Sequence, residues 1–112
     1  MQIFWHRDGG VMSKRVIIIH GTMGSPEGNW FPWLVRVLSE RGIEALCPAL
    51  PTPEGQDLEG WLAAFRRSVG GLRESDVLIG HSIGAAFVLR VLEQSPVFIR
   101  AAVLVAPFSR LL

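Results

Sequence analysis

The chain has 112 residues, 49% of them hydrophobic and 19% charged, with a formal net charge of +1. Its length fits a single domain, and its composition supplies apolar side chains for a core and too little charge for a disordered chain. Because the basic residues are scattered and no apolar run approaches the roughly 18 residues of a membrane span, nucleic-acid and membrane partners are excluded.

The cysteine content and the first residues bear on the setting of the protein. Cys47 is the only cysteine, so neither a disulfide framework nor a zinc site can be built. We therefore expect a reducing, cytoplasmic setting, an inert buried thiol, and no metal or cofactor. Residues 1–13 lack the apolar core of a signal peptide. We expect them to form an N-terminal extension, with residues 1–11 upstream of a natural start at Met12, and the domain to cover residues 14–112.

The first half of the chain predicts a strand, a loop, a helix and a second strand. The β-branched run at residues 16–19 is typical of a strand buried on both faces. The Gly-, Pro- and Ser-rich residues 20–29 predict a loop, residues 30–41 predict a helix that Gly42 ends, and residues 43–47 predict a short strand. The expected apolar face of this helix consists of Trp30, Trp33, Leu34, Val37 and Leu38.

The second half continues the alternation. A proline-containing loop at residues 49–56 leads to Asp57, which we expect to cap a helix that ends at Gly70 and Gly71. Residues 77–79 predict a third strand, residues 80–84 a sharp turn, residues 85–93 a helix, and Ala101–Val105 a fourth strand that ends before Pro107. The expected inward-facing residues of these two helices are Leu58, Trp61, Leu62, Phe65 and Val69, then Val88, Leu89 and Leu92.

This alternation of strands and helices predicts the fold class. It indicates an α/β fold with three αβα layers, a mostly parallel sheet and right-handed crossovers. We expect the doubly wound strand order 2-1-3-4, as in Rossmann-like folds. That order places the ends of the first and third strands side by side at the switch point where ligands bind.

The five residues Gly80-His81-Ser82-Ile83-Gly84 match G-x-S-x-G, the nucleophile elbow. A serine on a tight strand-to-helix turn projects its hydroxyl from the sheet edge, and flanking glycines remove Cβ clashes. We expect Ser82 to be a nucleophile and the Ile83 N–H, at the positive end of the following helix, to bind an oxyanion. The alternative is an ordinary turn in which Ser82 only caps the helix.

A second glycine-containing segment, His20-Gly21-Thr22-Met23-Gly24, directly follows the first strand. Acyl transfer needs a second oxyanion donor from a loop beside the elbow, and the backbone N–H of Thr22 or Met23 could supply it. In this interpretation His20 and Gly21 shape the loop, as Gly80, His81 and Gly84 shape the elbow. The alternative is a plain strand-to-helix loop.

Six segments, in order, carry a resemblance to a known family. They are residues 16–21 (VIIIHG), 29–34 (NWFPWL), 48–51 (PALP), 61–62 (WL), 79–84 (IGHSIG) and 102–106 (AVLVA). From about residue 15 to residue 107 the chain resembles the small serine hydrolases related to retinoblastoma-binding protein 9 and bacterial YdeN, within the α/β-hydrolase superfamily. The resemblance implies an esterase-like enzyme that acts on a small acyl ester through a Ser-Asp-His triad. Only the serine maps onto this chain, at Ser82.

The triad acid and histidine of the family follow the strand that here ends at Val105. We therefore expect both to lie beyond Leu112, and this chain to be an incomplete and impaired hydrolase. The apolar residues Phe108, Leu111 and Leu112 fit an interrupted domain.

None of the residues present is a convincing substitute for the missing pair. We expect His81 to point away from Ser82, His20 to shape the loop after the first strand, and His6 to be solvated. The alternative for His20, which is close to Ser82 in the expected fold, is to accept the proton of that serine. Asp76 is expected at the opposite end of the sheet, and Asp57 at a helix cap.

Other interpretations concern what the chain binds. A non-catalytic protein-binding module could use the same scaffold, and the open edge of the last strand invites self-association. A nucleotide-binding domain would need G-x-G-x-x-G or a P-loop lysine, and Gly21, Gly24 and Gly28 have the wrong spacing. Trp30, Trp33 and Trp61 fit core packing better than a ligand pocket.

Overall fold

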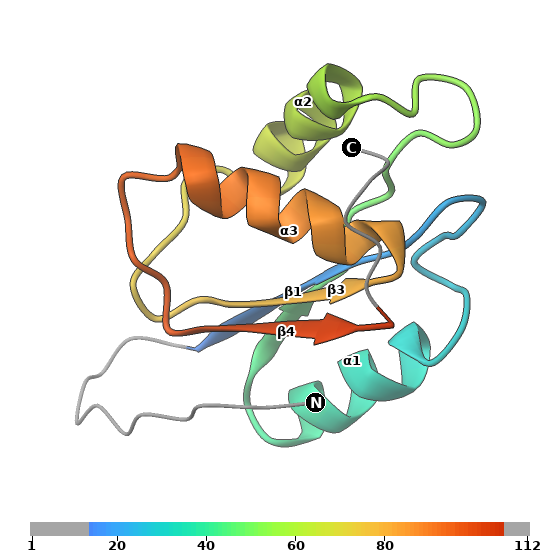
Figure 1. Ribbon diagram of the computed structural model, residues 1–112. Helices are drawn as coiled ribbons and strands as arrows, with labels where there is room; N and C mark the ends of the chain where they lie inside the picture. Colours follow the sequence, from blue (N-terminus) through green and yellow to red (C-terminus); the bar gives the residue numbers. More distant parts are fainter. Residues whose placement is uncertain (1–13, 107–112) are drawn as a thin grey trace.

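The computed structural model describes residues 14–106. The predicted N-terminal extension with Met12 and His6, and the residues from Pro107 onward, lie outside this range. Within it, strands and helices alternate as the sequence predicts (Figure 1). The elements are β1 (Arg15–Ile19), α1 (Phe31–Glu40), β2 (Glu44–Leu46), α2 (Leu58–Val69), β3 (Val77–His81), α3 (Ile83–Gln94) and β4 (Ala101–Val105).

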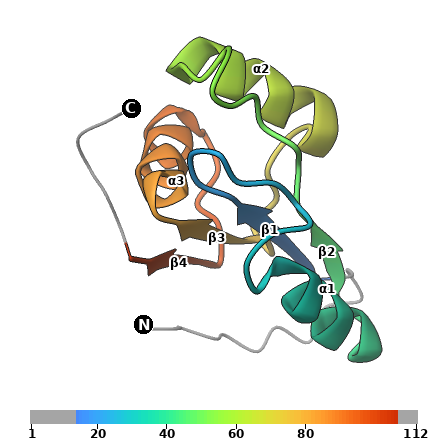
Figure 2. The ribbon, with the colours of Figure 1, turned by 90° about the vertical axis from the view of Figure 1, so that its right-hand side faces the viewer.

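The four strands form one parallel sheet in the order β2-β1-β3-β4, which confirms the predicted topology. Helix α1 covers one face of the sheet, and α2 and α3 cover the other (Figure 1, Figure 2). The three predicted layers are therefore present. Because β1 and β3 are neighbours, the loops that follow them begin at the same edge of the sheet.

Strand β1 is buried along its whole length because both of its faces are covered. Ile17 and Ile19 belong to the core on the α2 and α3 side. Val16 and Ile18, which alternate with them, belong to the core on the α1 side. The uninterrupted β-branched run is therefore explained by burial on both faces.

The inward face of α1 differs from the predicted one. Phe31 is fully buried, whereas Trp33, which we placed on the apolar face, is 55% exposed. Trp30, Leu34 and Leu38 pack against the core as predicted. Phe31 and Val35 join them, so that residues 31, 34, 35 and 38 follow the i, i+3, i+4, i+7 spacing of a helical face. In α3, Val88 and Leu92 pack against the core as predicted, whereas Leu89 is 43% exposed, so its predicted inward orientation is wrong. Phe87 and Val91 complete the buried face of this helix.

The ends of the first two helices confirm the sequence signals. Gly42 has a φ of 74°, and its N–H donates to Ser39 O while the N–H of Ile43 donates to Leu38 O. This pair of bonds is a Schellman motif, which needs a left-handed residue. At the start of α2, the Asp57 carboxylate accepts a hydrogen bond from the N–H of Gly60 at 2.6 Å.

A buried ion pair joins the amino ends of β1 and β3. The Arg15 guanidinium donates to both carboxylate oxygens of Asp76, at 2.9 and 2.7 Å, and both side chains are buried. Arg15 also donates to the carbonyls of Val69 and Gly71. The bond to Asp76 raises the pKa of Arg15 above its ordinary value. Asp76 thus has a structural role at the sheet edge opposite Ser82, as predicted.

Candidate active site

Ser82 is the single residue between β3 and α3. The strand continues to His81, which pairs with Val105 of β4, and the helix starts at Ile83. The turn is therefore tighter than the predicted turn over residues 80–84. Ser82 has a φ of 59° and a ψ of −126°, a strained conformation for a residue with a side chain. Its backbone is held there because its N–H donates to Val105 O at 2.9 Å and its carbonyl accepts from the N–H of Ala85 at 3.0 Å.

The side chain of Ser82 does not cap α3. Ser82 occupies the N-cap position, yet its hydroxyl makes no capping hydrogen bond. A capping serine would use its oxygen to accept from an N–H of the first helical turn. The geometry therefore gives no support to the alternative in which Ser82 merely ends the turn.

The two glycines of the elbow are required by close backbone contacts. A Cβ atom on Gly80 would lie 2.5 Å from Gly84 O and 2.6 Å from the Cα of Ala85. A Cβ atom on Gly84 would lie 2.5 Å from Ile19 O and 2.7 Å from His20 O. Neither glycine has a positive φ, so their role is steric rather than conformational. Gly84 lets the start of α3 touch the end of β1.

The loop after β1 lies directly against the elbow. A Cβ atom on Gly21 would lie 3.2 Å from the Cβ and 3.6 Å from the Oγ of Ser82. The N–H of Gly24 donates to Gly21 O at 3.0 Å and closes a tight turn in which Met23 has a φ of 59°. The sheet order thus brings the two glycine-containing segments together, as expected.

The three amides predicted to bind an oxyanion differ in their partners. The N–H of Met23 donates to Thr52 Oγ1 at 2.8 Å and is therefore occupied. Within residues 14–106, the N–H groups of Thr22 and Ile83 make no hydrogen bond. Ile83 is the first residue of α3, where backbone N–H groups have no partner inside the helix. Thr22 and Ile83 are the two amides left available for an oxyanion.

His20 is fully buried, and both of its ring nitrogens have partners. Nε2 accepts a hydrogen bond from the N–H of Leu50 at 2.9 Å, and Nδ1 lies 2.8 Å from Gly21 O. A nitrogen that accepts carries no proton, so we assign the proton to Nδ1, which donates to the carbonyl. The ring also contacts Trp61 edge to face, with centroids 5.7 Å apart. His20 therefore joins the loops after β1 and β2 and has no lone pair left to accept a proton from Ser82.

His81 packs on the α1 side of the sheet. Its ring lies edge to face with Trp30 and Phe31, with centroid distances of 5.7 and 5.9 Å. The side chain of His81 thus packs against residues at the start of α1, as expected.

The Cys47 thiol is a poor nucleophile. Burial raises the pKa of this thiol to about 11, so it stays protonated near neutral pH.

Sequence reasoning missed two polar residues at this site. Thr52 Oγ1 accepts from the N–H of Met23 and donates to Gln56 Oε1 at 2.6 Å, and Gln56 Nε2 donates to Thr22 Oγ1 at 2.7 Å. Both residues lie in the loop between β2 and α2. Their place after a strand that neighbours β1 is the only signal that could have found them.

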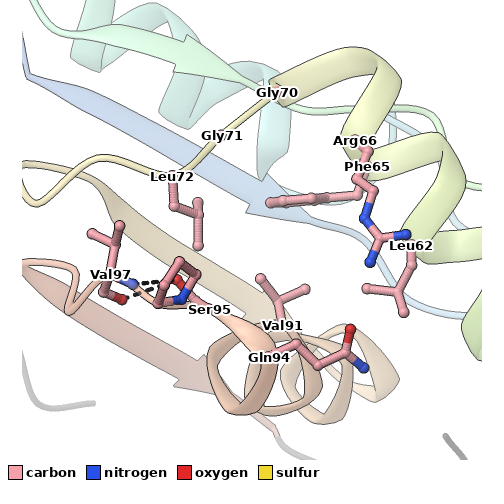
Figure 3. A pocket seen from close by; sticks show the side chains of 11 residues that line it. Leu62, Phe65, Arg66, Gly70, Gly71, Leu72, Val91, Gln94, Ser95 and Val97 are labelled. Atoms are coloured by element: carbon pink, nitrogen blue, oxygen red, sulfur yellow. Dashed lines mark hydrogen bonds between the residues drawn. The ribbon is translucent and has the colours of Figure 1, made fainter.

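A cavity of about 240 Å³ lies between α2 and α3 (Figure 3). Its lining includes Leu62, Phe65, Leu72 and Val91. Gly70 and Ser95, which end α2 and α3, also line it, so it lies at the edge of the sheet where β3 and β4 begin. Ser82 follows β3 at the other edge. Trp30, Trp33 and Trp61 do not line this cavity, and Trp61 is a fully buried core residue.

None of the helices between residues 14 and 106 is long and apolar enough to cross a membrane. Over the same range no three His, Cys, Asp or Glu side chains gather closely enough to hold a metal ion.

The chain is similar to proteins of known family and structure. A family model described as serine hydrolase matches residues 16–111. YdeN of Bacillus subtilis (strain 168), assigned by name to the hydrolases, is 39% identical over 82 residues, which are 73% of this chain and 43% of YdeN. The crystal structure of the ydeN gene product from B. subtilis matches 86% of this chain and 53% of its own with a TM-score of 0.75 and 34% identity.

A crystal structure of a PytH protein matches 87% of this chain and 41% of its own, with a TM-score of 0.65. At 21% identity this likeness shows the fold alone. The chain spans about half the length of these relatives.

Proposed function

Since this chain belongs to the serine hydrolase family, we propose that it carries the nucleophile and the oxyanion-binding amides of an esterase for small acyl esters. The observation that carries the proposal is the conformation of Ser82. Its backbone is strained at a φ of 59°, its hydroxyl does not cap α3, and it lies against the loop that begins at Gly21. Backbone strain persists only where the surrounding structure enforces it, and it concentrates at active sites.

The proposed reaction starts with attack of Ser82 Oγ on the ester carbonyl carbon. The carbonyl π electrons move to its oxygen, which becomes an oxyanion that the N–H groups of Ile83 and Thr22 bind. The positive end of α3 stabilises the same charge. Collapse of the tetrahedral intermediate expels the alcohol and leaves an acyl-serine, which water then hydrolyses to release the acid and restore Ser82.

The proton of Ser82 needs an acceptor, which we propose to be a histidine, held by a carboxylate, from outside the described residues. Both ring nitrogens of His20 are engaged, and the ring of His81 packs against α1. Without a base, a serine hydroxyl keeps its high pKa and attacks poorly. Turnover therefore depends on groups that residues 14–106 do not supply.

The lack of a base for Ser82 among residues 14–106 also favours a second candidate function. A protein with this scaffold and no base beside Ser82 would be a non-catalytic binding module. In that case the strained elbow would remain as part of the fold, without turnover.

The proposal is tested by hydrolysis of p-nitrophenyl acetate by the full-length protein, its Ser82→Ala variant and a matched control. Ser68→Ala removes an exposed serine hydroxyl from α2 and serves as the control. We expect Ser82→Ala to lower kcat/KM by at least about a thousandfold, as loss of a nucleophile does, and Ser68→Ala to leave it unchanged. Equal activity of Ser82→Ala and the native protein would refute the nucleophile role, and a folded native protein without activity would favour the binding module.

A further inference from the structure

The loops that follow β1 and β2 are joined by a closed set of side-chain hydrogen bonds. The N–H of Met23 donates to Thr52 Oγ1 at 2.8 Å, and the Thr52 hydroxyl donates to Gln56 Oε1 at 2.6 Å. The Gln56 Nε2 then donates to Thr22 Oγ1 at 2.7 Å. We refer to Thr52 and Gln56 as the bracket. The bracket binds two consecutive residues of the loop after β1: Thr52 accepts from the backbone N–H of Met23, and Gln56 donates to the side-chain oxygen of Thr22.

The bracket occupies one amide of this loop and leaves the neighbouring one without a partner within residues 14–106. A Cβ atom on Gly21 would lie 3.2 Å from the Cβ of Ser82, and the nitrogen of Thr22 is two bonds from the Cα of Gly21. Thr52 occupies the next amide along the chain, that of Met23, so that the Thr22 amide is left without a partner within residues 14–106. Without Thr52, the Met23 N–H would lose its partner, and the bond from the Gly24 N–H to Gly21 O would be left to hold the turn.

The bracket is itself anchored to the core. The N–H of Leu50, two residues before Thr52, donates to the buried Nε2 of His20. The indole N–H of Trp61 donates to Pro51 O at 2.7 Å from the fully buried ring. Thr52 therefore directly follows two residues whose backbone is hydrogen-bonded to buried side chains. Such support is what preorganised donors need, because an amide that must reorient during the reaction loses most of its effect.

We propose that Thr52 and Gln56 are positioning residues that hold the Thr22 N–H toward the oxyanion. The inference rests on the proposed function, since it concerns the same site. Neither residue touches the reacting atoms in this account; both act through the loop between Gly21 and Gly24. Their effect should fall on kcat, because the oxyanion exists only after Ser82 has attacked.

The test compares kcat and KM for p-nitrophenyl acetate in the full-length protein and in variants of the bracket. Thr52→Val and Gln56→Met keep the size of each side chain and remove the bonds. We expect each to lower kcat by about tenfold, less than the 10² to 10³ reported for complete loss of an oxyanion donor, with KM within about twofold. Thr52→Ser retains the hydroxyl and should have the kcat of the native protein. Glu54→Gln, at an exposed site of the same loop, is the control and should leave both constants unchanged.

Two further readouts separate positioning from simple destabilisation. The double variant Thr52→Val/Gln56→Met should be no slower than the slower single variant, because both changes open the same bracket. Amide hydrogen exchange at Met23 should accelerate by about fivefold or more in Thr52→Val and stay native-like in Thr52→Ser.

The outcomes distinguish this inference from the proposed function. An active native protein whose Thr52→Val variant keeps the native kcat would overturn the bracket and leave the nucleophile role intact. Loss of kcat in Thr52→Ser equal to that in Thr52→Val would also overturn it, since packing and not the hydroxyl would then be responsible. A native protein that is folded and inactive removes the proposed function, and the bracket with it.

Discussion

Replacing Gly84 with alanine would place a methyl group against the backbone of β1. The new Cβ atom would lie 2.5 Å from Ile19 O and 2.7 Å from His20 O. Ordinary carbon–oxygen contacts are about 3.3 Å, so α3 would have to move away from β1 by about 0.8 Å. Both contacts are to backbone atoms of fully buried residues, the last residue of β1 and the one that follows it, which cannot turn aside. Overpacking of this kind costs about 3 kcal/mol, while the better helix propensity of alanine returns at most about 1 kcal/mol.

We therefore expect Gly84→Ala to lower the free energy of unfolding by about 2 kcal/mol. Urea denaturation followed by tryptophan fluorescence measures this directly, and the midpoint should fall by about 1 M. Gly71→Ala is the matched control, because a Cβ atom there meets nothing within 4 Å and the residue has no positive φ. It should change stability by no more than about 1 kcal/mol, in the stabilising direction. A Gly84→Ala protein as stable as the native one would refute the account of the elbow packing.

Three other predictions concern the elbow, the ion pair and the thiol. Ser82→Gly should be more stable than Ser82→Ala by about 1 kcal/mol in the same urea assay, because glycine adopts a φ of 59° without strain; equal stability would contradict the strain. Asp76→Asn should cost about 3 kcal/mol because it leaves Arg15 buried without a counter-charge, whereas an effect below about 1 kcal/mol would show that the pair is unimportant. Burial raises the pKa of Cys47 from 9.0 to about 11, so iodoacetamide at pH 8 should modify the folded protein about a hundredfold more slowly than the urea-unfolded chain. As the pH rises, the thiol ionises in the unfolded chain before it ionises in the folded protein. The contribution of Cys47 to the free energy of unfolding is therefore complete below pH 9.0 and is lost as the pH rises toward about 11. Urea midpoints that do not fall across this range would contradict the raised pKa.

The topology could be predicted from the sequence because its signals are local and strong. The β-branched run in β1 and the alternation of strands with helices define a parallel sheet, and the observed order β2-β1-β3-β4 follows. The G-x-S-x-G motif placed a sharp turn at Ser82, and the structure shows that turn reduced to one strained residue. These features depend on residues close together in the chain.

The phase of α1 could not be settled from the sequence. Trp30, Phe31 and Trp33 are all large and apolar, so the hydrophobic pattern fits two helical faces. Packing against the sheet decides between them and buries Phe31. In α3 nearly every residue of the first two turns is apolar, so the pattern gave no reason to exclude Leu89 from the core.

Hydrogen-bonded pairs between distant segments could not be predicted from the sequence, for a different reason. Met23 and Thr52 are 29 positions apart, and Arg15 and Asp76 are 61 apart. Hydrogen bonds of this kind leave no periodic pattern, and they exist only after the sheet has brought the loops together. The same holds for His20, whose role depends on the N–H of Leu50.

Covalent labelling of Ser82 would show whether this serine is a nucleophile. The full-length protein is treated with a fluorophosphonate, and the adduct is located by mass spectrometry of the intact protein and its peptides. We expect one adduct, on Ser82, that is absent from Ser82→Ala and from protein unfolded in urea. A folded native protein that takes up no label, or one whose label persists in Ser82→Ala, would contradict it.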